Sequence, residues 1–131
     1  CKWKNFKQIY IILVMKKFSN FLIDYNSNII DAVYKIQQNK SREVIILSKK
    51  KVLGILSEGD ILRCILKGIS LHSPVSKHYN KNFKFLNEKN EKNEKNALIY
   101  FSKYNLNIIP VVNKKFELKD IIILSKILNK I

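Results

Sequence analysis

The sequence predicts an α/β fold made of two copies of one strand–helix–strand–strand–helix unit. Residues 54–60 close an apolar β-type run and open an amphipathic helical pattern, and a half-matching copy of this segment returns at residues 120–126. The chain has 131 residues, 47% of them hydrophobic, which suffices for one compact domain or two half-domains with a common core. Neither half could bury both faces of its own sheet, so we expect the halves to pack together.

The first unit starts near residue 16. Residues 21–23 form a short strand-like run, and apolar residues then recur at helical spacing from Ile29 to about Asn39. The unbroken apolar run at 44–47 suits a strand that is buried on both faces. Residues 52–56 supply the next strand after a turn of lysines.

The last helix of this unit should begin at Ser57, and Gly68 stands where a left-handed C-terminal cap is expected. Cys64 falls within the helical pattern and should pack as a small apolar group. Cys1 and Cys64 form neither a disulfide framework nor a C-x-x-C pair. We therefore expect a cytoplasmic protein in a reducing compartment.

The same order returns after the connector. Residues 87–96 contain three Asn-Glu-Lys units, which predict a hydrophilic loop. Pro110 lacks the N–H that a sheet ladder requires, so we expect it on an edge strand or at the start of a strand. The predicted elements are a strand at 83–86, a helix at 97–105, strands at 108–112 and 116–124, and a helix from Ser125.

Residues 1–15 carry no recognisable motif. The apolar run at 9–15 is too short to span a bilayer, which needs about 20 residues. No small-residue cleavage site follows it, so a signal peptide is not indicated. Met15 is the only methionine, and Met-Lys-Lys reads as a translation start. We expect an N-terminal extension or tag, and no membrane partner.

The formal charge of +15 would ordinarily indicate nucleic acid or an anionic membrane. Here the basic residues are nearly all lysines spread along the chain, with Arg42 and Arg63 as the two arginines. That bias is typical of an AT-rich genome, whereas nucleic-acid binders concentrate arginine on one face. We expect a solvated lysine surface. A basic nucleic-acid-binding domain stays open as an alternative and predicts steep salt dependence.

Residues 54–60 resemble the signature of the CBS (cystathionine-β-synthase) domain pair, which is Gly, two apolar residues, Ser or Thr, two further residues and Asp. Ile-Pro-Val-Val at 109–112 resembles a strand of the second unit of such pairs. The string at 59–75, with Asp-Ile-x-Arg and Lys-Gly-Ile-Ser-Leu, is similar to pairs found in front of sugar-nucleotide nucleotidyltransferase domains. The resemblance covers residues 16–131.

The resemblance implies two tandem β-α-β-β-α CBS motifs packed as a pseudo-two-fold pair. Motif 1 would span residues 16–70, the connector 71–81, and a degenerate motif 2 residues 82–131. Aligned without gaps, the second motif has Asp120 for the glycine, Ile123 for the hydroxyl residue and Lys126 for the acid. An apolar side chain and an ammonium group cannot accept hydrogen bonds from a ribose, so the second cleft should not bind a nucleotide in the family's usual way. Glu43 stands where the family often has Pro.

The cleft that the resemblance implies in motif 1 would bind an adenine nucleotide or adenosyl ligand, such as AMP, ADP, ATP or S-adenosylmethionine. An ionised Asp60 can accept bonds from two vicinal ribose hydroxyls, and the helix start at Ser57 favours phosphate. Gly59 would leave room for the ligand, and Arg63 would reach phosphate or merely pair with Asp60. The candidate nucleotide-binding residues are Ser57, Gly59, Asp60, Arg63, and the strand backbone at Val44 and Ile45.

The same residues also predict an ordinary helix cap. Serine at the start of a helix accepts an unpaired N–H, and an acid in the first turn faces the positive end of the helix dipole. No catalytic set and no metal site is recognisable, since His72 and His78 lie in the connector without partners at ligand spacing. We therefore expect no cofactor and no catalysis by this chain.

The sequence thus predicts a non-catalytic regulatory domain. It would bind one adenine nucleotide, form a homodimer, as family members pair through their helices, and modulate an attached or partner enzyme, with a sugar nucleotidyltransferase as the candidate. A structural homodimerisation module with no ligand is the alternative, because the second motif has lost its polar residues.

Overall fold

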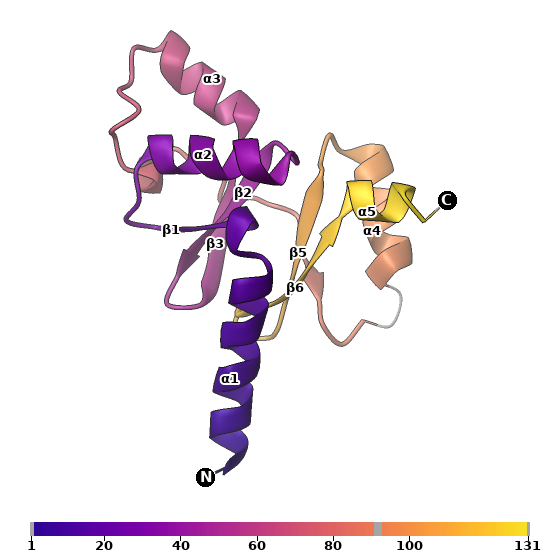
Figure 1. Cartoon of the computed structure of the whole chain (residues 1–131). Coiled ribbons are helices and arrows are strands. Elements are labelled where there is room, and N and C mark those ends of the chain that lie inside the picture. Colours follow the sequence, from indigo (N-terminus) through magenta and orange to yellow (C-terminus); the bar gives the residue numbers. More distant parts are fainter. Residues whose placement is uncertain (1, 91–92, 131) are drawn as a thin grey trace. The chain divides into compact units, whose positions relative to one another are not determined.

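The computed structural model describes residues 2–90 and 93–130, and these form two compact α/β units. The first unit is Asn20–Phe83, and the second is Lys84–Ile131 together with the chain up to Ser19. Each unit contains one three-stranded sheet. The predicted α/β fold, with two strand–helix–strand–strand–helix units, is therefore confirmed (Figure 1).

The first unit contains all the elements predicted for it, with small differences at their ends. They are, in chain order, β1 (Leu22–Asp24), α2 (Ile29–Asn39), β2 (Glu43–Ser48), β3 (Lys51–Ser57) and α3 (Glu58–Leu66). Strand β2 is the middle strand, parallel to β1 and antiparallel to β3. Because β2 is flanked on both sides, its continuous apolar sequence is fully buried up to Leu47.

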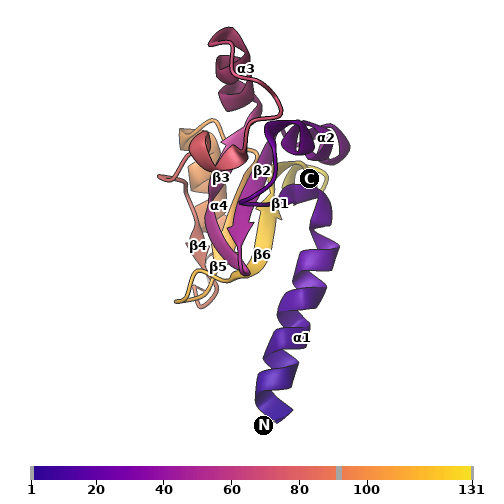
Figure 2. The ribbon, with the colours of Figure 1, turned by 90° about the vertical axis from the view of Figure 1, so that its left-hand side faces the viewer.

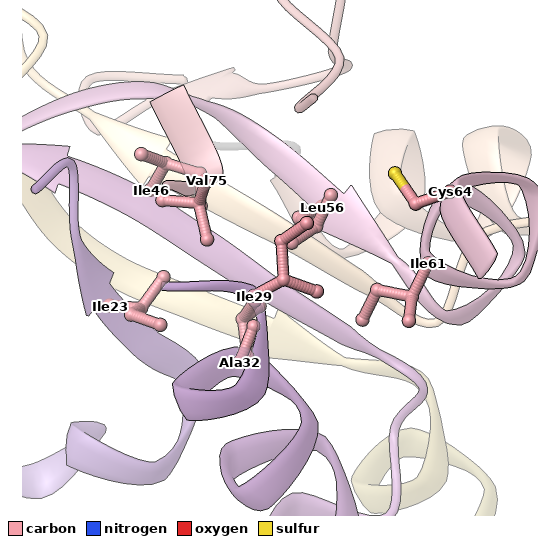
Figure 3. Close-up of a cluster of buried hydrophobic side chains, with 9 residues drawn as sticks. Ile23, Ile29, Ala32, Ile46, Leu56, Ile61, Cys64 and Val75 are labelled. Carbon is pink, nitrogen blue, oxygen red and sulfur yellow. The ribbon is translucent and has the colours of Figure 1, made fainter. Parts of the chain in front are cut away.

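The core of the first unit joins both helices to the sheet (Figure 3). Ile29 and Ala32 come from α2, and Ile61 and Cys64 from α3, as the helical spacing predicted. They pack against strand residues such as Val44 and Ile46, which are two positions apart and therefore lie on the same face of the sheet. The helical residues are three positions apart and lie on one face of their helix. The buried members are Ile23, Ile29, Ala32, Val44, Ile46, Leu56, Ile61, Cys64 and Val75.

The end of α3 is fixed by the glycine that the sequence marked. Gly68 has φ of +75°, the left-handed conformation that glycine adopts at little cost. Its N–H bonds the carbonyl of Ile65 at 3.0 Å, and the N–H of Ile69 bonds the carbonyl of Cys64 at 3.0 Å. This pair of bonds is the Schellman motif, so the predicted C-terminal cap is confirmed.

The second unit repeats the order of elements. Strand β5 is in the middle, parallel to β4 and antiparallel to β6. One cluster of buried side chains in this unit consists of Leu86, Ala97, Ile109 and Val111. The elements are β4 (Leu86–Asn87), α4 (Asn93–Lys103), β5 (Ile108–Val112), β6 (Leu118–Ile123) and α5 (Leu124–Leu128).

Several details of the second unit differ from the prediction. Helix α4 begins at Asn93, so the last residues of the loop predicted at 87–96 are helical, and residues 91 and 92 lie outside the described residues. The strand predicted at 116–124 spans 118–123. The strand expected at 83–86 is shorter and lies at Leu86–Asn87. Pro110 was expected on an edge or at a strand start, but it lies inside the middle strand β5. The short β4 explains this, because its residues pair with Val111 and Val112 and leave no β4 residue opposite Pro110. The missing N–H is therefore tolerated in a central strand.

The N-terminal segment forms a long helix, α1 (Lys2–Lys17), which both ribbon views show as uninterrupted (Figures 1 and 2). This helix belongs to the second unit and contacts β6. Ile11 and Val14 are buried, and Lys119 of β6 places its Nζ 4.5 Å from the ring centroid of Tyr10. Across residues 2–90 and 93–130, no helix combines the length and the apolar composition that crossing a bilayer requires.

A close backbone contact explains the glycine in β3. The connector forms an isolated bridge with β3, in which Ile55 and Asn80 exchange N–H···O bonds of 3.1 and 2.8 Å. A Cβ on Gly54 would overlap the backbone oxygen of Asn80 and the ring of Tyr79. Glycine in a strand interior often marks such a close approach.

We predict that Gly54→Ala lowers the free energy of unfolding by about 1–3 kcal/mol, because the new methyl group must displace the connector. Urea unfolding followed by circular dichroism measures the change. Gly59→Ala is the matched control, since its Cβ would meet atoms of Arg63 and Ser57 at ordinary distances of 3.6 and 3.7 Å. In that helical position alanine should stabilise the protein by roughly 0.4–1 kcal/mol. Equal effects of the two substitutions would contradict this account.

Candidate functional site

The candidate site lies where β3 ends and α3 begins. Ser57 is the last residue of β3 and the N-cap of α3, with extended backbone angles. It pairs with Glu43 at the start of β2, so this end of the sheet and the helix start lie together. The N–H of Glu58 donates to the carbonyl oxygen of Arg42 at 2.8 Å. At least one N–H group at the start of α3 therefore already has a hydrogen-bond acceptor within the chain.

Asp60 and Ser57 form a reciprocal capping box. The Oδ2 atom of Asp60 accepts the N–H and the Oγ–H of Ser57, both at 2.9 Å. In return, the N–H of Asp60 donates to Oγ of Ser57 at 3.1 Å. An aspartate in the first turn also faces the positive end of the helix dipole. The cap that the sequence predicted as an alternative reading is therefore present.

The second oxygen of Asp60 has a different partner. Its Oδ1 accepts a bond of 2.6 Å from Nη2 of Arg63, one turn further along α3. The Arg63 side chain is 65% exposed and that of Asp60 21% exposed. Exposed pairs of this spacing contribute only about 0.3–0.5 kcal/mol. A ligand hydroxyl can therefore replace Arg63 on Oδ1 while Oδ2 keeps the helix capped.

The structure brings four of the six predicted site residues together. Ser57, Gly59, Asp60 and Arg63 lie within the cap and the first two turns of α3, and a Cβ on Gly59 would lie 3.6 Å from a guanidinium nitrogen of Arg63. The other two lie outside this segment.

Val44 and Ile45 lie inside the middle strand with fully buried side chains. Val44 has a ladder partner on β3, and Ile45 has partners on β1 and β3. A contact between their backbone and a base stays a prediction.

The loop between α2 and β2 was not singled out by the sequence, yet it supports the site. Asn39 donates through Nδ2 to the carbonyl of Glu43 at 3.0 Å and accepts through Oδ1 the N–H of Ser41 at 2.7 Å. These bonds hold Lys40 and Arg42 with positive φ of 57° and 65°. The Arg42 carbonyl thereby meets the start of α3. Asn–Lys–Ser before a buried strand is a turn signal that indicates such a loop.

Tyr79 of the connector packs against Gly54 of β3. Its ring meets Tyr25 edge-on, with centroids 6.4 Å apart and planes at 80°. Burial raises the pKa of Tyr79, and the electrostatic influence of Tyr25 adds to the increase. Gly54 was the available signal for this packing, because a strand glycine indicates a close neighbour.

The equivalent turn of the second unit confirms the gapless alignment. Ile123 pairs with Ile108 and is the N-cap of α5, as Ser57 pairs with Glu43 and caps α3. The side chain of Ile123 makes no capping hydrogen bond at the start of α5.

Lys126 occupies the place of Asp60, with its Nζ 5.9 Å from the ring centroid of Phe18. A cavity of about 410 Å³ lies beside this turn, and its lining combines apolar residues of β6 with three lysines and with Asn93, Glu94 and Asp120. Hydroxyl and carboxylate acceptors are absent from the two motif positions of this turn.

The comparisons with known proteins agree with this geometry. Residues 14–67 match the family model of the CBS domain. No curated protein matches the chain. Solved structures of CBS domain pairs match most of its length, and since their identities lie below 25%, they establish the fold. The chain has the fold of a CBS domain pair.

Three of these structures illustrate the likeness. A CBS domain protein from Pyrobaculum aerophilum, complexed with AMP, is 19% identical over 79% of each chain, with a TM-score of 0.67. A CBS domain pair/ACT domain protein from Thermotoga maritima is 19% identical over 83% of this chain and 85% of its own, with a TM-score of 0.69. The CBS domain pair of protein MJ0100, in complex with 5-methylthioadenosine and S-adenosyl-L-methionine, is 19% identical over 84% and 86%, with a TM-score of 0.68.

We predict that Ser57→Ala lowers the free energy of unfolding by roughly 0.5–2 kcal/mol, because it removes the hydroxyl that takes the N–H of Asp60. Ser102→Ala is the matched control, since the exposed Ser102 hydroxyl bonds only a carbonyl of its own helix, that of Ile99, at 2.9 Å among the described contacts. Denaturant unfolding of the two variants measures both. A loss at Ser102 as large as that at Ser57 would show that the cap is unimportant.

Proposed function

We propose that this chain is a non-catalytic regulatory CBS domain pair that binds an adenine nucleotide or adenosyl ligand at the β3–α3 turn of its first unit. The observation that carries the proposal is the division of the Asp60 carboxylate: Oδ2 holds the cap, and Oδ1 is held by an exposed arginine. Oδ1 can therefore accept a ribose hydroxyl when Arg63 moves away. The released guanidinium can then bind phosphate.

Ligands of two similar structures support the chemical class. AMP is bound to the Pyrobaculum aerophilum protein, and S-adenosyl-L-methionine with 5-methylthioadenosine to protein MJ0100. All three ligands carry a ribose with an adenine. We propose the same class here for the first unit alone, because Ile123 and Lys126 replace the hydroxyl and the acid in the second unit.

Occupancy of this site would regulate an attached or partner enzyme. A ligand at 100 times its dissociation constant supplies about 2.7 kcal/mol, which is enough to shift a balanced two-state arrangement. The string at 59–75 makes a sugar nucleotidyltransferase the candidate enzyme.

Among the described residues, no group of three or more His, Cys, Asp and Glu side chains is arranged to hold a metal ion.

Homodimerisation is the second candidate function, and the exposed apolar face of the first unit favours it. Leu62, Ile65 and Leu66 of α3 are large and exposed, with Leu66 at 85% exposure, and Tyr34 of α2 is also exposed. Such a cluster on helices that could pair indicates an interface. A second copy of the chain is the proposed occupant, since the resemblance implies pairing through helices.

We predict that at least one of AMP, ADP, ATP, adenosine and S-adenosylmethionine raises the melting temperature at millimolar concentration. For that ligand, Asp60→Ala should weaken binding by roughly 10–100-fold in calorimetry, because a charge-assisted hydrogen bond is lost. Asp120→Ala is the matched control, which removes the same charge from the second unit and should leave affinity unchanged. Circular dichroism verifies that both variants are folded.

Arg63→Ala separates the two roles of the site. We expect it to weaken AMP more than adenosine, since only AMP offers a phosphate to the guanidinium. No stabilisation by any of the five compounds would overturn the ligand function and leave the dimerisation module. Binding that is indifferent to Asp60→Ala would place the ligand elsewhere.

The dimer has its own test. We predict that Leu66→Glu weakens self-association by roughly tenfold or more, because it places a charge in the apolar contact. Leu128→Glu, at an exposed apolar position of α5, should leave self-association unchanged. Sedimentation velocity over a concentration series measures both. A wild-type chain that stays monomeric at high concentration would contradict this proposal.

A further inference from the structure

The cavity of about 410 Å³ beside the last strand–helix turn of the second unit has an apolar floor. Phe18, Ile121 and Ile123 contribute to this floor, and each is at most 5% exposed. Ligand sites in proteins are mostly apolar cavities of roughly 300–1,000 Å³ that carry a few polar groups. The size and the floor therefore suit a small ligand with an apolar part, and the polar groups of the lining decide its chemistry.

Two lysines of the lining come together at the ring of Phe18. The Nζ atoms of Lys17 and Lys126 lie 5.1 and 5.9 Å from the centroid of this ring. Neither ammonium group forms an ion pair among the described residues. Lys130 lines the same cavity. Two unpaired cations beside one buried ring favour an anionic group of a ligand, because hydrogen bonds between charged groups are the strong ones.

The start of α4 supplies acceptors to the same cavity. Asn93 donates through Nδ2 to the carbonyl oxygen of Asn87 at 2.9 Å, which fixes the orientation of its amide. Its Oδ1 is buried and has no hydrogen-bond partner in the described part of the chain. Buried acceptors are nearly always satisfied in folded proteins, so this oxygen indicates a donor from a ligand. Glu94 and Asp120 also line the cavity, and neither carboxylate forms an ion pair with a lysine of the lining.

We propose that this cavity binds the zwitterion of a free amino acid with an apolar side chain. Acidic and basic groups line one cavity without pairing across it, so a ligand that carries both charges can join them. Its ammonium group donates to Oδ1 of Asn93 and to the carboxylate of Glu94. Its carboxylate accepts from Lys17 and Lys126, and its side chain lies on the apolar floor. A nucleotide fits less well, because Ile123 and Lys126 cannot accept hydrogen bonds from a ribose. The proposal is independent of the nucleotide site in the first unit.

Calorimetry on the full chain with L-leucine and L-phenylalanine tests this site. We expect saturable binding of at least one of them at millimolar concentration. The analogue without the amine (isocaproate or hydrocinnamate) and the analogue without the carboxylate (isoamylamine or phenethylamine) should each bind roughly tenfold more weakly, because one set of charge-assisted bonds is lost. AMP should not displace the amino acid. Absence of saturable binding by both amino acids, or displacement by AMP, would overturn the proposal.

Two substitutions assign the two charges to their ends of the cavity. Lys126→Gln should reduce the preference for the amino acid over the amine, since recognition of the carboxylate is weakened. Glu94→Gln should reduce the preference for the amino acid over the acid without an amine. Lys16→Gln is the matched control, because Lys16 is an exposed lysine of α1 outside the lining, and it should change neither preference. Circular dichroism verifies that the variants are folded. Equal effects of Lys16→Gln and Lys126→Gln, or the same change of preference in both site variants, would contradict the proposed orientation and the site.

Discussion

The carboxylate of Asp60 joins the end of the first sheet to the start of α3, and the two oxygens of this group serve different partners. Oδ2 accepts two hydrogen bonds from Ser57 and keeps the helix start ordered. Oδ1 faces an exposed guanidinium. Since the solvent-exposed pair contributes little to stability, Oδ1 can exchange its partner while α3 remains in place. A helix cap and a ligand site are thus compatible in one residue, provided that each uses its own oxygen.

The second unit shows what the same backbone becomes without this carboxylate. Ile123 stands in register where Ser57 does, yet α5 starts without a side-chain cap, whereas α3 starts with one. Apolar alternation sets the strand register in both units, whereas the polar groups at the turn are independent of it. The second unit therefore has the same fold without the hydroxyl and the carboxylate at its last strand–helix turn.

Local patterns predicted what depends on neighbours in sequence. The helices α2 to α5, most strands, the Gly68 cap and the Ser57–Asp60 cap follow from spacing or turn chemistry within a few residues. Features that depend on distant segments did not follow. Pro110 is central because β4 is only two residues long, and nothing near Pro110 encodes that length. Gly54 meets the connector at Tyr79 and Asn80, and periodicity within β3 carries no information about that segment.

Helix α1 is the clearest case of this limit. A helix of 16 residues is marginal alone, so packing of Ile11 and Val14 in the second unit stabilises it and determines which face remains outside. The apolar run at 9–15 therefore supplies Ile11 and Val14 to the second unit and leaves Ile9, Ile12 and Leu13 exposed. Which of its apolar residues a helix buries depends on the element that it packs against, and the local pattern does not encode that element.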